Sequence, residues 1–425
     1  MSSKIIKELQ TLIEEKVITI EVANKIEAYY DSKNIPQNNR LLTVFGVLGS
    51  LLVGLGIILV LAHNWDQFSR SIKSILAFLP LVIGQIVVGY SLLKKKSKTW
   101  LESSGVFLFF SVGSCISLIS QIYNIPGNFN TFIVSWVLLC LPLIYLIKSK
   151  GVLLLTIVFS TIYAISLGYG FSDGKEIPWM YLLILSLIIP KYYTLIKKES
   201  AKNVTVILNW LIPLSFILVF GTFLSLNHKF EILIYIFLLG LIYNIGHLNI
   251  FKQIRLSKNG YKIIGSVGLV IVLLITSSKD FWSNSFNIST LKIKEIIIVS
   301  LLLISTLVIL IKNDTFLNFN VKKVFLVSPV LMLCVFLMHY LNDLLPAISL
   351  NIFILALGIS VIKRGVDTSN FVFLNYGLLI ITSLIVTRFF DTDLTFVVRG
   401  LLFILVGVGF FASNYLMVKK SKKKN

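Results

Sequence analysis

The sequence predicts an all-α, polytopic integral membrane protein with about fourteen transmembrane helices and both termini in the cytoplasm. Three observations predict this class. Hydrophobic residues make up 56% of the 425 residues and charged residues only 14%, whereas soluble proteins have about 25% charged residues. The hydrophobic residues form runs of roughly 20 residues, the length of a helix that crosses a bilayer. The basic residues are concentrated in every second polar segment, as in chains that cross a membrane repeatedly.

Residues 1–40 precede the first hydrophobic run and are predicted to form a cytoplasmic, amphipathic helical hairpin. Ile6, Leu9 and Ile13 share one side of a first helix, and Thr19 is a typical N-cap for a second helix. A hairpin of about 35 residues is too small to bury a core of its own. We therefore expect it to pack on the membrane or to dock a cytoplasmic protein partner through residues 1–34.

Residues 41–418 are predicted to form the transmembrane domain, which begins with Leu41–Ala62. These 22 residues contain no charged side chain and cover roughly 30 Å as a helix. Gly46, Ser50 and Gly54 repeat every fourth position, so that three small residues form one face for close helix packing. The alternative is that glycine is simply common in membrane helices. Thirteen further runs follow, over residues 72–93, 104–123, 130–147, 151–170, 177–196, 204–226, 232–250, 262–276, 296–311, 324–341, 346–362, 371–387 and 395–418.

The charge distribution tests this count independently. With the N-terminus inside and fourteen crossings, the inner segments hold 30 of the 39 lysines and arginines, and the inner side carries the whole net charge of +20. A wrong number of crossings would scramble this alternation. The basic tail, residues 419–425, is therefore predicted to lie in the cytoplasm, on the anionic inner surface of the membrane.

The position of the charges also excludes nucleic acid as a partner. A net charge of +20 would suggest nucleic acid only if the basic residues formed a patch on a soluble surface, whereas here they lie in short loops between hydrophobic runs. Membrane lipids are the expected partners. Cys115, Cys140 and Cys334 lie in hydrophobic runs and are expected to be buried, with no disulfide and no metal site. No cofactor is expected.

The arginines indicate a candidate site on the predicted outer side. The chain strongly prefers lysine, and three of its six arginines are among the few outer basic residues. Arginine's planar fork suits carboxylate or phosphate better than lysine does. Arg388 and Arg399 flank two aspartates, Asp391 and Asp393. The four residues either form ion pairs that close the last helical hairpin or bind an anionic group such as a lipid phosphate.

Two other outer segments are expected to join this site. One follows the first hydrophobic run and places a tryptophan among polar residues, and the other is an uncharged turn that contains Pro126-Gly127. No catalytic motif accompanies them, and the outer histidines lack the spacing of metal ligands. The candidate outer-face polar and anion site comprises His63, Asn64, Trp65, Asp66, Arg70, Lys73, Tyr123, Asn124, Arg388, Asp391, Asp393 and Arg399.

Three stretches of the sequence resemble a known family. They are Ala62-His-Asn-Trp65 with the preceding helix pair VITIEVANKIEAYY, Gln121-Ile-Tyr-Asn-Ile-Pro-Gly127 with Trp136, and RFFD with the last hydrophobic run and the lysine tail. Over its N-terminal third and its C-terminal end, the chain resembles the uncharacterised bacterial membrane protein family named domain of unknown function 2157. The resemblance implies a multi-pass protein of the bacterial inner membrane. It assigns no activity and no catalytic residue.

For the function, the sequence favours a transporter or lipid-handling protein with an outward-facing polar or anion site, since the helix number and the small-residue packing are typical of such proteins. The alternative is a membrane sensor or scaffold that docks a partner through the N-terminal hairpin. A membrane enzyme acting on lipid-linked substrates ranks third, because no nucleophile or metal set is visible. No acidic residue lies inside a predicted span, which argues against ion coupling through a carboxylate at the midplane.

Overall fold

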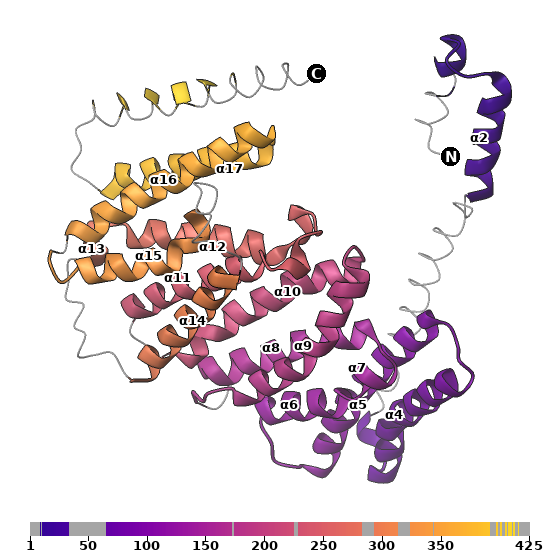
Figure 1. Ribbon diagram of the computed structural model, residues 1–425. Helices are drawn as coiled ribbons and strands as arrows, with labels where there is room; N and C mark the ends of the chain where they lie inside the picture. Colours follow the sequence, from indigo (N-terminus) through magenta and orange to yellow (C-terminus); the bar gives the residue numbers. More distant parts are fainter. Residues whose placement is uncertain are drawn as a thin grey trace. The chain divides into compact units, whose positions relative to one another are not determined.

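The computed structural model describes residues 11–33, 65–171, 174–224, 228–282, 293–312, 324–342 and 344–391, together with Leu9 and scattered positions between 397 and 415. Within these residues the chain forms α-helices, short 3-10 helices and turns, and it contains no strand (Figure 1). The predicted all-α class is confirmed for this part of the chain. The small-residue face of Gly46, Ser50 and Gly54 and the basic tail lie outside the described residues, so both stay predictions.

Among the described residues, α-helices alternate with turns and with four 3-10 helices, η1 (Trp65–Gln67), η2 (Gly221–Phe223), η3 (Asn249–Phe251) and η4 (Leu256–Lys258). The α-helices are α2 (Ile20–Lys33), α4 (Arg70–Leu93), α5 (Lys98–Tyr123), α6 (Phe129–Cys140), α7 (Leu143–Leu146), α8 (Lys150–Tyr169), α9 (Trp179–Glu199), α10 (Asn203–Phe220), α11 (His228–Ile245), α12 (Gly260–Thr276), α13 (Lys279–Trp282), α14 (Ile293–Lys312), α15 (Val324–Met338), α16 (Leu344–Thr368) and α17 (Phe371–Asp391).

Nine stretches of helix among the described residues are long and apolar enough to cross a membrane. They are α4, α5, α6 with α7, α8, α9, α10 with η2, α14, α16 and α17. Three shorter apolar helices, α11, α12 and α15, fall on further predicted runs. Every run predicted between residues 72 and 387 therefore coincides with an apolar helix. The count of fourteen and the cytoplasmic termini stay predictions, because the first run and most of the last one lie outside the described residues.

The chain divides into two compact units, Met1–Leu76 and Ala77–Asn425. In the first unit, a helical segment ends before Lys16, which has a left-handed backbone (φ 55°), and α2 begins directly after Thr19, as the sequence predicts. In the second unit, α11 packs on α12 and α16 packs on α17, while α8 lies against α6 and α10.

Glycines permit the closest of these helix contacts. A Cβ on Gly265 of α12 would lie 2.6 Å from the backbone nitrogen of Tyr243 in α11. A Cβ on Gly377 of α17 would lie 2.8 Å from the carbonyl oxygen of Gly358 in α16. Small residues at helix crossings are the usual means by which membrane helices approach closely. The sequence pattern therefore fixes two tight hairpins, α11–α12 and α16–α17.

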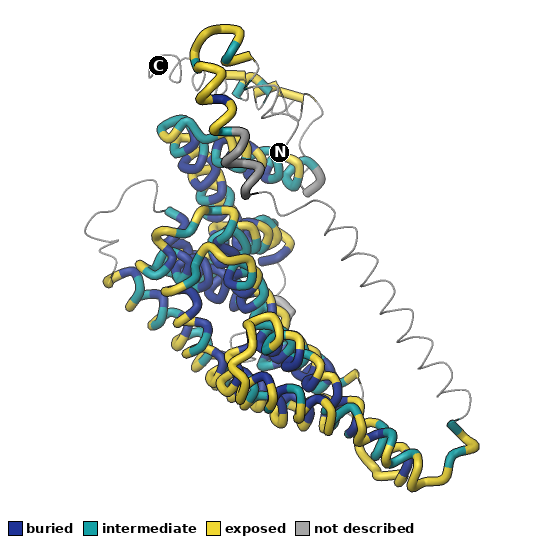
Figure 2. The backbone as a smooth tube through the Cα atoms, turned by 90° about the vertical axis from the view of Figure 1, so that its right-hand side faces the viewer, coloured by how far each residue is buried: buried dark blue, intermediate teal, exposed yellow. Residues whose placement is uncertain are grey.

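Many residues within the helices are exposed (Figure 2), and a large share of them carry large apolar side chains. Ile86, Leu139, Leu301 and Ile352 are each 63% exposed, although all four lie inside long helices. A soluble protein rarely leaves such continuous apolar surface in water. Lipid chains cover this surface in a membrane, so the exposure agrees with insertion into a bilayer.

Two expectations about buried residues are wrong. Helix α14 begins at Ile293, three residues before the predicted run, and its first turn carries Glu295 with only 2% of its surface exposed. Acidic residues are favoured in the first turn of a helix because the helix dipole is positive there. The prediction that no acidic residue lies inside a span therefore fails for Glu295. Cys334 lies on the exposed side of α15, whereas Cys115 and Cys140 are buried as expected.

Candidate functional site

A cleft of about 560 Å³ opens where α5 turns into α6, beside the first half of α4. We call it the α5–α6 cleft. It lies at the predicted outer end of these helices and in the turn that the sequence marks by Pro126-Gly127. Its lining consists of Phe78, Cys115, Ile116, Ser117, Ile119, Ser120, Ile125, Pro126, Gly127, Asn128, Phe129, Thr131, Phe132 and Ser135.

Hydrogen bonds fix both ends of the turn that forms one wall of the cleft. Asn124 ends α5 in a left-handed conformation (φ 51°), which asparagine tolerates better than most residues, and its N–H donates to the carbonyl of Ser120. Asn128 Oδ1 accepts from the N–H of Thr131 at 2.8 Å, and Thr131 Oγ1 accepts from the N–H of Asn128 at 3.3 Å. This reciprocal pair is a capping box at the start of α6. The wall is therefore rigid before any ligand binds.

Trp136 packs against the cleft lining and joins α6 to α5. Its indole N–H donates to the carbonyl of Phe109 at 2.7 Å, and its ring lies 5.5 Å from that of Phe132 in the cleft lining. A Cβ on Gly113 would overlap the indole ring, so only glycine lets α5 approach the tryptophan here. Buried aromatic side chains with a bonded N–H contribute both packing energy and a fixed orientation.

The cleft lining is mostly apolar and carries a few polar groups, none of which is acidic or basic. Ser117 and Ser135 supply hydroxyl groups and Asn128 supplies the N–H groups of its amide, whereas the Thr131 hydroxyl is used in the capping box. Hydroxyl and amide groups can both donate and accept hydrogen bonds. The phenyl rings of the lining add apolar area. Such a site suits an uncharged polar group attached to an apolar body, and it offers no ion pair to an anion.

The predicted outer site is only partly described. In the first unit, Lys73 Nζ lies 5.8 Å from the centre of the Trp65 ring, Asp66 belongs to η1 and Arg70 begins α4. Tyr123 and Asn124 end α5, next to the cleft, although the lining itself begins at Ile125. Asp391 is the last residue of α17. His63, Asn64, Asp393 and Arg399 lie outside the described residues.

Arg388 contacts the end of another helix. Its Nη1 donates to the carbonyl of Ser277 at 3.1 Å, directly after the C-terminus of α12. Asn351 Nδ2 donates to the same carbonyl at 3.0 Å, and the indole N–H of Trp282 donates to the carbonyl of Thr276 at 2.7 Å. A cation suits the negative end of a helix dipole. These contacts fasten α16 and α17 to the end of α12.

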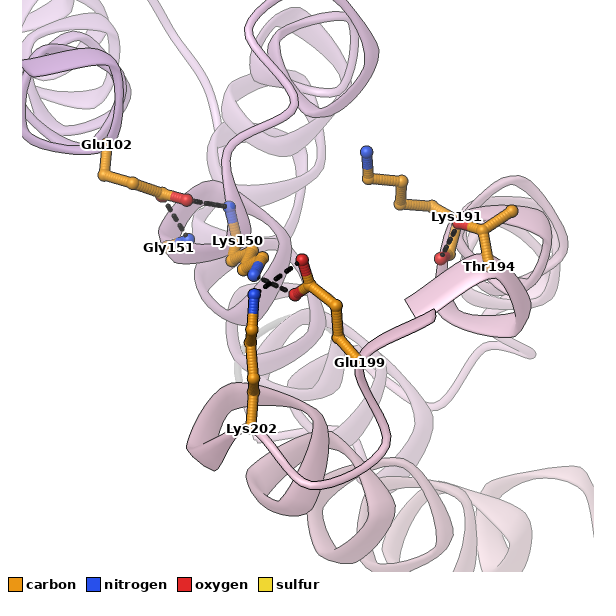
Figure 3. A network of polar contacts seen from close by, with 7 residues as sticks. All are labelled: Glu102, Lys150, Gly151, Lys191, Thr194, Glu199 and Lys202. Atoms are coloured by element: carbon orange, nitrogen blue, oxygen red, sulfur yellow. Dashed lines mark hydrogen bonds and ion pairs between the residues drawn. The ribbon is translucent and has the colours of Figure 1, made fainter. Parts of the chain in front are cut away.

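A second polar network lies at the opposite, predicted inner ends of α5, α8, α9 and α10 (Figure 3). The Glu102 carboxylate accepts the backbone N–H groups of Lys150 and Gly151, each at 2.9 Å, and so caps the start of α8. Glu199 pairs with Lys150 and, at 2.9 Å, with Lys202. Each carboxylate is satisfied by groups from another helix, so the network joins helices and offers no acid for chemistry.

The cleft, its turn and Trp136 all lie in a segment with recognisable relatives. Residues 10–153 match the family described as predicted membrane protein (DUF2157). This match confirms the resemblance over two of the three stretches named above, whereas the likeness of the C-terminal stretch stays a prediction. No curated protein and no solved structure matches the chain. The family description and the apolar helices together make this a membrane-associated protein of unknown function.

Sequence reasoning found the turn but missed the helix faces that complete the cleft. Phe78, Ser117 and Ser135 come from three helices, and hydropathy does not tell which way a uniformly apolar helix is rotated. The available signal was local. Ser117 and Ser120 stand three residues apart, so they share a face of α5 next to a turn already marked by Pro and Gly. Among the described residues, no group of three or more His, Cys, Asp or Glu could hold a metal ion.

Proposed function

We propose that the protein is a transporter or lipid-handling protein of the bacterial inner membrane that binds the uncharged polar part of an amphiphile at its outer surface. The α5–α6 cleft carries this proposal. It combines a fixed turn, hydroxyl and amide groups, and phenyl rings in one space of about 560 Å³. Small-molecule sites in proteins have volumes of roughly 300–1,000 Å³ and place a few polar groups on an apolar wall.

The charge of the lining selects the class of headgroup. An anion that leaves water gains most from a cationic partner, because losing its water costs several kcal/mol, and the cleft lining supplies no cation. A neutral group such as a sugar or glycerol hydroxyl needs only hydrogen bonds, which the serine hydroxyls and the Asn128 amide can supply. The cleft therefore favours an uncharged, hydroxyl-bearing headgroup.

Exposed apolar residues at the rim of the cleft can contact the apolar part of the amphiphile. Phe78 and Phe129 are each 47% exposed and Ile125 is 52% exposed, so apolar surface leads outward from the polar lining. Exposed apolar residues of α4 continue it, among them Leu79 and Val82. A lipid chain can lie along this helix while its headgroup occupies the cleft. This arrangement is what distinguishes an amphiphile from a water-soluble sugar.

The test compares lipids that co-purify with the full-length protein and with Ser117→Leu/Ser135→Leu, which fills the cleft with apolar side chains. The control is Ser186→Leu, at an exposed serine of α9 whose hydroxyl bonds only within its own helix turn. We expect mass spectrometry to find a neutral amphiphile with the parent protein and the control, and to find it lost from the double variant. Equal retention by all three folded proteins would refute the proposal.

The predicted anion site on the outer side is tested separately. Arg388→Ala/Arg399→Ala should release a bound anionic lipid if these arginines serve such a site. An unchanged lipid profile from the folded double variant would leave Arg388 with the role its geometry supports, as a cap for the end of α12.

A sensor or scaffold that docks a partner through the N-terminal hairpin is the second candidate function. Val17, Ile20 and Val22 are 63%, 65% and 43% exposed, so apolar side chains of this segment are available for a protein contact. Deleting residues 1–34 separates the two functions. A scaffold then loses its partner in a pull-down from the native membrane, whereas a lipid-handling protein keeps its bound amphiphile.

A further inference from the structure

We infer a second binding site, for the phosphate of an amphiphilic or small organic anion, at the predicted inner ends of α11, α12, α16 and α17. A cavity of about 420 Å³ lies there, between the α11–α12 hairpin and the α16–α17 hairpin. We call it the inner cavity. It shares no residue with the α5–α6 cleft and does not depend on the function proposed for that cleft.

Two cationic side chains from separate elements line the inner cavity. Lys262 comes from the first turn of α12 and Arg364 from the last turns of α16, while His247, just after α11, adds an imidazole ring. The lining contains no aspartate or glutamate, and Asp367, one turn beyond Arg364, is not part of it. Among the described residues, no ion pair involves Lys262 or Arg364. The protein therefore brings two fixed positive charges together in one cavity and supplies no anion from its wall.

Arg364 packs on an aromatic ring. Its guanidinium lies 4.4 Å from the centre of the Phe373 ring in α17, and Tyr243 of α11 lines the same cavity. A guanidinium held on an aromatic face keeps its N–H edges free to form paired hydrogen bonds. Phosphate and carboxylate oxygens match that edge geometry.

The remaining polar groups of the cavity differ in their hydrogen bonds. The Ser266 and Ser360 hydroxyls donate to the carbonyls of Ile263 and Leu357 in their own helices, whereas the buried Tyr376 hydroxyl has no hydrogen-bond partner among the described residues. His247 Nδ1 lies 3.0 Å from the carbonyl oxygen of Tyr243. Because a carbonyl oxygen can only accept, Nδ1–H of His247 is the donor in this contact. A lysine, an arginine and a tyrosine hydroxyl around one space are typical of a phosphate site.

The location of the inner cavity and the apolar residues of its lining indicate what the phosphate is attached to. Val267, Phe325 and Val372 surround the polar groups, so the anion carries an apolar portion or lies against apolar surface. Basic pockets between membrane helices on the cytoplasmic side are known to bind anionic lipid headgroups. A lipid phosphate and the phosphate of a soluble metabolite share this chemistry, and the experiment separates them.

The full-length protein is placed in nanodiscs of phosphatidylcholine with or without phosphatidylglycerol, and bound lipid is measured by native mass spectrometry. We expect retained phosphatidylglycerol with the parent protein and, for Lys262→Gln or Arg364→Gln, a loss of affinity of about tenfold, the effect of one charge-assisted hydrogen bond. The matched control is Lys363→Gln, which removes the same charge from the exposed neighbour of Arg364. It should bind as the parent does.

A cavity-filling variant and a second ligand complete the experiment. Ser266→Phe fills the cavity without changing its charge, and it should also lose the lipid, even if Arg364→Gln does not fold. Protection against thermal unfolding by inorganic phosphate, with no retained lipid, would assign the site to a soluble phosphate compound. Equal losses in Lys363→Gln and Lys262→Gln would overturn the proposal in favour of diffuse surface charge, as would the failure of both phosphate probes to bind the parent protein.

Discussion

The α5–α6 cleft and the inner cavity are built in opposite ways. The cleft is formed by residues that lie close together in the chain, is uncharged, and depends on a turn fixed by a capping box. The inner cavity is formed by two hairpins that are distant in the sequence, and it contains Lys262 and Arg364 with no acidic partner in the lining. One protein thus offers a neutral polar site at one predicted membrane surface and a cationic site at the other.

The difference shows what holds each site together. The cleft depends on local geometry, since Asn124, Asn128 and Thr131 define its wall within a few residues. The inner cavity depends on the packing of the two hairpins against each other. Arg388 and Asn351 stabilise that packing at the other end of α12, where both donate to the carbonyl of Ser277. A change in one site should therefore leave the other intact, and that independence can be tested.

The largest expected effect is at Trp136, which packs against the cleft lining. Trp136→Ala removes a buried indole and its hydrogen bond to Phe109, and we expect a loss of stability of about 3 kcal/mol or more. Thermal unfolding in detergent measures this loss. Trp100→Ala is the control, because Trp100 is on the same helix as Phe109 and is 54% exposed. Equal shifts for both variants would show that the indole of Trp136 does not organise the cleft.

A smaller effect is expected at the crossing of α11 and α12. A Cβ on Gly265 would lie 2.6 Å from the backbone of Tyr243, so Gly265→Ala must push the two helices apart at a cost of about 1–3 kcal/mol. Anion binding in the inner cavity should weaken as well, while the cleft keeps its neutral ligand. Gly89→Ala is the matched control, because nothing lies within 4 Å of a Cβ at that position. An unchanged melting temperature for Gly265→Ala would contradict this packing.

The sequence predicted the fold well because hydropathy is local. Each run between residues 72 and 387 became an apolar helix, and the Pro126-Gly127 turn became the wall of a cleft. It did not predict the inner cavity, because its two cations, Lys262 and Arg364, are about a hundred residues apart and fit the ordinary positive-inside pattern of inner loops. Nor could it predict the contact between Arg388 and Ser277, which are 111 residues apart. Such contacts depend on how each helix is rotated about its axis. The hydropathy of a uniformly apolar helix does not indicate that rotation.

The most direct test of two independent sites is one native mass spectrometry experiment on the parent protein, Ser117→Leu/Ser135→Leu and Lys262→Gln/Arg364→Gln. All three are reconstituted with the same mixture of a neutral glycolipid and phosphatidylglycerol. We predict that the cleft variant loses the neutral lipid alone and that the cavity variant loses the anionic lipid alone. Loss of both lipids from either folded variant, or loss of neither from both, would contradict the account.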